Sequence, residues 1–138
     1  MKGVRLTPLR KISTEKGDVR HALKRGEADF KGFGEVYFSE IFPGDQKGWK
    51  RHNRITLNLV VVVGQIRFTI LDQREGSDTY NQREVHTLSV QDNYARLSVD
   101  PGLWMMFEGL GQSTSVLMDL INEEHDPSEC DRRAIDPM

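Results

Sequence analysis

The chain has 138 residues, of which 37% are hydrophobic and 29% are charged, and its formal net charge is −2. This length is enough for one domain with a hydrophobic core, so we expect a single domain over residues 1–138. The chain has no basic excess, which disfavours nucleic acids and anionic membrane surfaces as partners.

The sequence also lacks the marks of a membrane or secreted protein. No apolar stretch approaches the roughly 20 residues that a membrane-spanning helix needs, and the start, Met1 to Arg5, has no apolar signal core. The single cysteine, Cys130, cannot form an intramolecular disulfide, and no cysteine cluster indicates zinc. We therefore predict a cytoplasmic protein.

Glycine and proline interrupt the chain at short intervals, and the runs between them favour short β-strands, as in an all-β sandwich or barrel. A helical turn is expected over residues 21–25, and the polar segment 122–138 is expected to form an extended arm or a short helical turn. The expected strands cover residues 34–42, 55–63, 65–72, 84–88, 94–99, 103–108 and 114–122.

The apolar run 57–63 does not alternate with polar residues, which predicts a strand covered on both faces. After a tight turn at Gly64, where glycine allows positive φ, Ile66, Phe68 and Ile70 alternate with polar residues. This unit follows Gly48-Trp49-Lys50-Arg51-His52, so we expect His52 at the mouth of the barrel, where an imidazole can transfer protons.

Short motifs follow one another along almost the whole chain: Thr7-Pro8-Leu9, Glu15-Lys16-Gly17-Asp18, Pro43-Gly44 with Gly48-Trp49-Lys50-Arg51-His52, Val61-Val62-Val63-Gly64-Gln65-Ile66-Arg67 with Leu71-Asp72-Gln73-Arg74, Ser77-Asp78-Thr79-Tyr80, Val99-Asp100-Pro101-Gly102-Leu103-Trp104 and Ala134-Ile135-Asp136-Pro137. This ordered set resembles the dTDP-4-dehydrorhamnose 3,5-epimerases and the related sugar 3,4-ketoisomerases. The resemblance implies their fold, the double-stranded β-helix or jelly-roll barrel of the RmlC-like cupins.

The same resemblance implies a sugar-nucleotide isomerase or epimerase that needs no cofactor and removes a proton beside the ketone of an NDP-4-keto-6-deoxyhexose. The family's histidine base maps to His52, and a homodimer is expected. Cationic and aromatic groups would bind the nucleotide sugar, since guanidinium groups match phosphate oxygens. The candidates are Trp49, Lys50, Arg51, Arg54, Arg67 and Lys16.

The chain also departs from the family pattern. The tyrosine that serves as acid falls near Leu117-Met118-Asp119, where no tyrosine is present, so Tyr37, Tyr80 and Tyr94 become candidate replacements. The histidine expected after Pro101-Gly102 is replaced by Trp104-Met105-Met106-Phe107, of which we expect Met105, Met106 and Phe107 to pack in the barrel. The carboxylate that orients the family's histidine is expected beyond the end of this chain.

These departures leave alternatives open. One is a cupin that binds a nucleotide sugar or another carbohydrate without catalysis, and another is a structural β-barrel that dimerises through an exposed strand. A metal cupin is disfavoured, because such sites need two or three histidines and a carboxylate from two strands. Here the segment Arg51-His52-Asn53 contains one histidine, and the strand after Pro101-Gly102 contains none.

Overall fold

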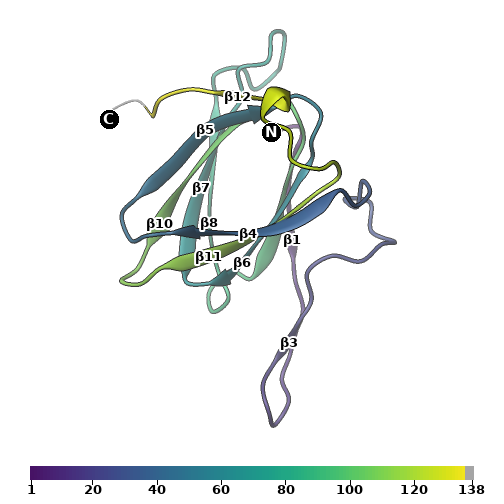
Figure 1. Cartoon of the computed structure of the whole chain (residues 1–138), viewed down its shortest axis with the longest axis vertical. Helices are drawn as coiled ribbons and strands as arrows, with labels where there is room; N and C mark the ends of the chain where they lie inside the picture. Colours follow the sequence, from purple (N-terminus) through teal and green to yellow (C-terminus); the bar gives the residue numbers. More distant parts are fainter. Residues whose placement is uncertain (136–138) are drawn as a thin grey trace.

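The computed structural model describes residues 1–135 and consists of two antiparallel five-stranded sheets packed face to face (Figure 1). The first sheet has the order β1 (Val4–Pro8), β9 (Ala95–Val99), β6 (Leu57–Val63), β11 (Ser115–Ile121) and β4 (Glu35–Ile41). The second sheet has the order β12 (Cys130–Arg132), β5 (Gln46–His52), β10 (Trp104–Leu110), β7 (Gln65–Leu71) and β8 (Arg83–Ser89). The predicted all-β fold is confirmed.

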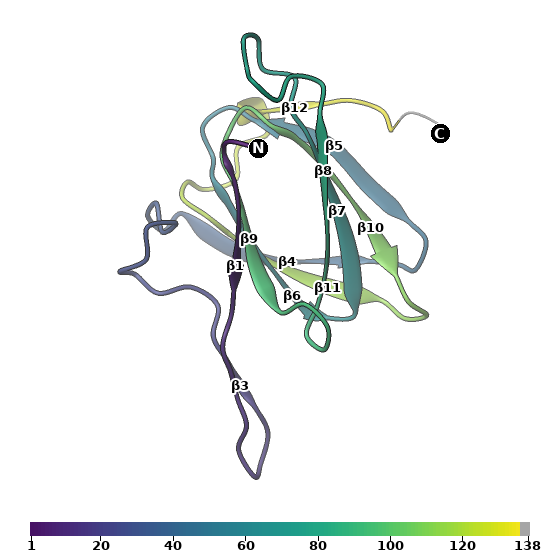
Figure 2. The same ribbon diagram turned by 180° about the vertical axis from the view of Figure 1, so that it is seen from behind.

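A separate hairpin of β2 (Lys11–Ile12) and β3 (Val19–Arg20) extends away from the two sheets (Figures 1 and 2). Ile12 and Val19 on this hairpin are 36% and 53% exposed. A short two-stranded hairpin is only marginally stable in water by itself. The hairpin therefore presents apolar side chains without a covering layer from the described part of its own chain.

The space between the two sheets holds the main hydrophobic core. Ile66, Phe68 and Ile70 of β7 are fully buried, so the alternation predicted for this strand is confirmed. Val60 and Val61 of β6 are also buried, although they point to opposite faces of the first sheet. The prediction that β6 is covered on both faces is therefore confirmed at Val60 and Val61.

The outer cover of the first sheet comes from the irregular segment 21–33. Arg96 on β9 is only 1% exposed and donates a hydrogen bond to the carbonyl oxygen of Ala22 at 2.6 Å. Its guanidinium also forms ion pairs with Glu27 at 2.8 Å and Asp29 at 3.4 Å. A buried guanidinium needs such partners, because an unpaired buried charge is costly. Arg96 therefore fixes the segment against the sheet.

The sequence-based element assignment was incomplete at three places. Residues 21–25 form no helix, because their backbone groups bind Arg10 and Arg96 instead. The hairpin β2–β3 and strand β1 were not predicted. Strand β5 was also missed, since Gln46–His52 is mostly polar and lacks an apolar alternation. The polar tail does form a short 3₁₀ turn, η1 (Pro127–Glu129), and then β12.

Gly109 on β10 lies beneath the turn that joins β4 to β5. Its backbone exchanges hydrogen bonds with Gly44 and Asp45, and a Cβ at this position would lie 2.5 Å from the carbonyl oxygen of Phe42. We predict that Gly109→Ala lowers the free energy of unfolding by about 2 kcal/mol, because overpacking forces the turn outward. Urea denaturation measures this change.

The matched control is Gly26→Ala, because a Cβ on Gly26 meets no atom within 4 Å. Its effect should stay within about 0.5 kcal/mol, as for ordinary surface substitutions. Equal unfolding midpoints for the two variants would contradict the close approach at Gly109.

Candidate active site

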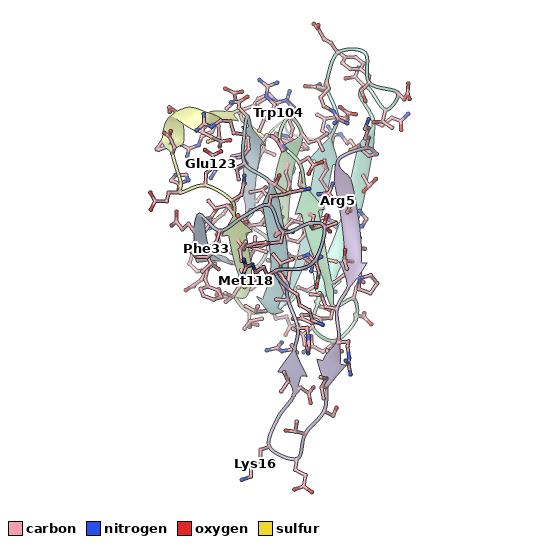
Figure 3. All side chains as sticks on the ribbon, turned by 90° about the vertical axis from the view of Figure 1, so that its right-hand side faces the viewer. Arg5, Lys16, Phe33, Trp104, Met118 and Glu123 are labelled. Carbon is pink, nitrogen blue, oxygen red and sulfur yellow. The ribbon has the colours of Figure 1, made fainter. Side chains whose placement is uncertain are left out.

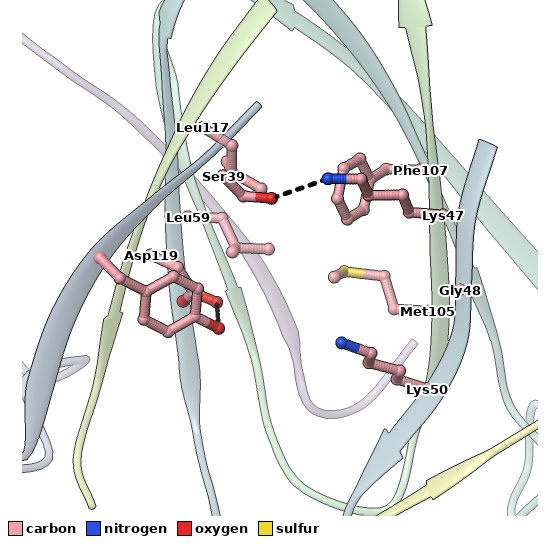
Figure 4. Close-up of a pocket in the computed structure, with 10 residues that line it drawn as sticks. Ser39, Lys47, Gly48, Lys50, Leu59, Met105, Phe107, Leu117 and Asp119 are labelled. Carbon is pink, nitrogen blue, oxygen red and sulfur yellow. Dashed lines mark hydrogen bonds between the residues drawn. The ribbon is translucent and has the colours of Figure 1, made fainter. Parts of the chain in front are cut away.

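A cavity of about 310 Å³ lies between the two sheets, at the side formed by β4, β11, β5 and β10 (Figure 4). Its volume falls at the low end of the roughly 300–1,000 Å³ typical of small-molecule sites. The lining side chains come from five strands. They are Tyr37, Ser39, Lys47, Gly48, Lys50, Leu59, Met105, Phe107, Leu117 and Asp119.

The polar groups of the cavity lie on facing strands, as Figure 4 shows. On β4, Tyr37 and Ser39 point inward while the alternate residues Val36 and Phe38 are exposed. On β5, Lys50 points inward between two outward residues. Lysine and phenol groups from opposite sheets therefore face a common space.

Asp119 of β11 is the carboxyl group of this cavity. It lies directly opposite Tyr37 in the strand pairing, and the Tyr37 hydroxyl donates a hydrogen bond to Asp119 Oδ2 at 2.8 Å. Burial raises the pKa of Asp119 to about 7, although the Tyr37 hydrogen bond and the charge of Lys50 act in the opposite direction. Its other oxygen, Oδ1, is buried and has no hydrogen-bond partner within residues 1–135.

His52 is at the end of β5, two residues after Lys50, and its side chain is 12% exposed. Strand alternation places it on the same inward face as Lys50, because Trp49 and Arg51 both point outward. Its Nδ1 lies 2.6 Å from Glu129 Oε1. Glu129 comes from η1, so the polar tail supplies a carboxylate to the predicted base.

Glu129 is only 1% exposed, and its second oxygen, Oε2, accepts hydrogen bonds from three backbone N–H groups. These belong to Asn53, Arg54 and Ile55, at 2.8, 2.7 and 3.0 Å. Burial raises the pKa of Glu129, but these N–H groups and His52 outweigh burial and lower it. An ionised Glu129 accepts from Nδ1, which leaves the lone pair of His52 on Nε2.

The prediction that the orienting carboxylate lies beyond the end of this chain is wrong, because Glu129 takes that position. Glu129 is distant from His52 in sequence and lies in a polar tail, so no local pattern marked it. Asp119 could have been found from the sequence pattern. It lies on the inward face of the alternating strand β11, together with Ser115, Leu117 and Ile121, and it is the acid in that set.

The predicted binding residues fall into two groups. Lys50 lines the cavity. The others lie outside it: Trp49 is buried on the outer face of the second sheet with Trp104, and Arg51 lies over Trp104 and pairs with Asp131. Arg54 pairs with Glu123, and Arg67 pairs with Glu108. Lys16 is at the tip of the hairpin (Figure 3). Their roles in binding stay predictions.

Of the candidate replacement tyrosines, only Tyr37 lines the cavity. Tyr80 is 52% exposed, and the Tyr94 hydroxyl donates to the carbonyl oxygen of His21. Met105 and Phe107 point into the barrel, whereas Met106 packs on the outer face against Trp49 and Trp104. Asp136 and Pro137 of the closing motif lie outside the described residues.

Within residues 1–135, no group of three or more histidine, cysteine, aspartate or glutamate side chains could hold a metal ion. No helix in this part of the chain is long and apolar enough to cross a membrane.

Comparison with known proteins identifies the relatives of this arrangement, although no protein-family model matches the chain. The crystal structure of a dTDP sugar isomerase from Desulfovibrio desulfuricans G20 is 35% identical and has a TM-score of 0.93. The match covers 96% of this chain and 85% of that chain. This chain belongs to the dTDP-sugar isomerase family.

Two more distant matches are a curated protein and a second solved structure. The spore coat polysaccharide biosynthesis protein SpsL of Bacillus subtilis (strain 168) is 23% identical, over 96% of this chain and 87% of that protein. The RmlC epimerase of Legionella pneumophila Philadelphia 1 shares the fold, with a TM-score of 0.82 at 17% identity over 94% of this chain and 72% of that chain. The expected RmlC-like cupin fold is confirmed.

For this isomerase-family chain, the buried Glu129 carboxylate predicts a pH-dependent contribution to stability. Its folded-state pKa is lowered, so its contribution is present above the unfolded pKa of about 4.3 and is lost as pH falls through the folded pKa. We predict that Glu129→Gln lowers the free energy of unfolding by about 2 kcal/mol at neutral pH, in the range for hydrogen bonds to a charged group. The difference should shrink below about pH 4.

Urea denaturation of the two proteins at several pH values measures this difference. Glu124→Gln is the control, since Glu124 is an exposed carboxyl of the same segment. A loss of stability at Glu129 that stays constant down to low pH would show that the carboxylate charge does not cause it.

Proposed function

We propose that this chain is a sugar-nucleotide isomerase or epimerase in which His52 removes a proton from the carbon beside the ketone of an NDP-4-keto-6-deoxyhexose. The observation that carries the proposal is the His52–Glu129 pair, in which His52 follows the cavity-lining Lys50 by two residues on β5 and shares its inward face. Glu129 holds Nδ1 as a donor, so Nε2 has the lone pair that a general base requires. Membership of the dTDP-sugar isomerase family supports this substrate class.

Removal of such a proton leaves negative charge on the former ketone oxygen, and that charge needs stabilisation. Lys50 carries an ammonium group on the same face of β5 as His52, and it lines the cavity. An ammonium in a site partly closed by Leu59, Met105 and Phe107 stabilises an enolate better than it would in water. We assign Lys50 this role.

The second candidate is a cupin that binds a nucleotide sugar without turning it over. Met118 favours it, because it is at the place of the family's tyrosine and lies on the outer face of the first sheet. The experiment below separates the two functions. The predicted cytoplasmic location stays a prediction.

The first test is incorporation of solvent deuterium into dTDP-4-keto-6-deoxyglucose, measured by NMR. We predict that wild-type protein exchanges a hydrogen beside the ketone, and that His52→Ala lowers the exchange rate by at least about 100-fold, as expected on loss of a general base. His125→Ala is the control, because His125 is exposed in the tail. Binding of the sugar nucleotide without exchange in wild-type protein would favour the binding function.

We also propose that the chain forms a homodimer. The exposed hairpin β2–β3 supports this, as do the exposed apolar side chains of the first sheet and its neighbouring loops. These are Phe33, Val36, Phe38, Phe42 and Val63. Exposed apolar patches on a folded protein often mark sites of protein–protein interaction.

Sedimentation should therefore show a species of twice the chain mass of 15.8 kDa. We predict that Phe38→Asp shifts the protein toward the monomer, because it places a charge on this surface. Val85→Asp on β8 of the second sheet is the control, since Val85 is 53% exposed. A wild-type protein that sediments only as the 15.8 kDa species would contradict the proposal.

A further inference from the structure

Asp119 is the one feature of the cavity that the proposed function leaves without a role. A buried carboxyl oxygen without a hydrogen-bond partner costs about 1–3 kcal/mol. Asp119 Oδ1 is such an atom within the described residues, while Oδ2 is satisfied by Tyr37. Because Asp119 lines the cavity, a bound molecule can reach its side chain.

Asp119 and His52 come from opposite walls. Asp119 is on β11 of the first sheet, and His52 is on β5 of the second sheet. Figure 4 shows Asp119 across the cavity from Lys50, and Lys50 precedes His52 on the same inward face of β5. A sugar ring bound between the sheets would therefore present one face to each group.

We propose that Asp119 is the second proton-transfer group, and that its carboxyl group delivers a proton to the face of the sugar opposite His52. The proposal rests on the proposed function and narrows it to epimerisation. If one group removed and returned the proton on the same face, the configuration would not change.

The proton balance is as follows. His52 Nε2 takes the proton from the carbon beside the ketone, and the C–H electron pair forms the enolate, whose charge lies on the oxygen near Lys50. The enolate then takes the proton of the neutral Asp119 carboxyl on its other face, which restores the ketone with inverted configuration. His52 is left protonated and Asp119 ionised, and exchange with water resets both.

The surroundings of Asp119 suit this role. Burial raises the pKa of Asp119 to about 7, so the acid form is available near neutral pH. Tyr37 is a positioning residue, because its hydroxyl donates to Oδ2 and holds the carboxyl group in place. Glu35 of β4 raises this pKa and Lys50 of β5 lowers it, while Leu59 of β6 and Met105 of β10 carry no charge.

The experiment follows dTDP-4-keto-6-deoxyglucose in D₂O and separates two readouts. The first is deuterium exchange into the starting sugar, and the second is formation of an epimer. We predict that Asp119→Asn lowers epimer formation by at least about 100-fold and keeps exchange within about threefold of wild type. His52→Ala should lose both.

Asparagine keeps an oxygen that can accept from Tyr37, so the strand pairing should persist, and a thermal melt checks this. Glu40→Gln is the matched control, because it makes the same chemical change on an exposed, outward position of β4. Wild-type epimer formation by a folded Asp119→Asn protein would overturn the proposal, and so would equal loss of exchange and epimer. Absence of both in wild-type protein would overturn the proposed function itself.

A pH profile tests the role of Tyr37. Epimer formation should fall as pH rises through the Asp119 pKa near 7, because the acid form is lost. In Tyr37→Phe the ionised carboxylate loses a hydrogen-bond donor, so the pKa rises and this fall should move to higher pH. A fall that stays at the same pH would overturn the positioning role.

Discussion

The buried carboxylate of Glu129 is the interaction on which the site depends. One oxygen binds His52, and the other collects the N–H groups of the turn that follows β5. A buried carboxylate with so many donors is electrostatically satisfied, so burial does not neutralise it. It therefore fixes three things together: the tautomer of the imidazole, the exit of the chain from β5 and the path of the tail. The pairing of β12 with β5 extends the same attachment.

The interior of the barrel is divided into two regions. Between β7, β9 and most of β6, the inward positions are apolar and closely packed. Toward β4, β11 and β5, the inward positions include Tyr37, Asp119 and Lys50, and a cavity takes the place of the core. Polar groups on inward positions lower stability unless something pairs with them. Here that conflict is confined to the side of the barrel that holds the cavity.

How much the sequence predicts depends on the range of the interactions involved. The strands with strong apolar patterns, such as 65–71, follow from local alternation, and the order of motifs indicates the cupin barrel. His52 was found because it lies in such a motif. β5 was missed as a strand, because its charged residues are exposed or paired across the sheet. The alternation within β5 also explains why Trp49 and Arg51 point away from the cavity while Lys50 points into it.

The partners of the reactive groups could not be predicted locally, since they are set by tertiary pairing. Glu129 is 77 residues from His52, and Asp119 is 82 residues from Tyr37. Sequence gives the residue types, but only the packing of two sheets determines which of them meet.

These separations also bear on how the protein folds. Contacts between distant residues carry a large loop-closure entropy and form slowly compared with local hairpins such as β7–β8. The His52–Glu129 pair and the Tyr37–Asp119 pair each close such a long loop. A chain that has folded only its local hairpins therefore contains neither pair. A partly folded chain therefore contains neither an oriented imidazole nor a fixed acid opposite it. The proposed site therefore assembles only together with the closed barrel, and an incompletely folded chain lacks it.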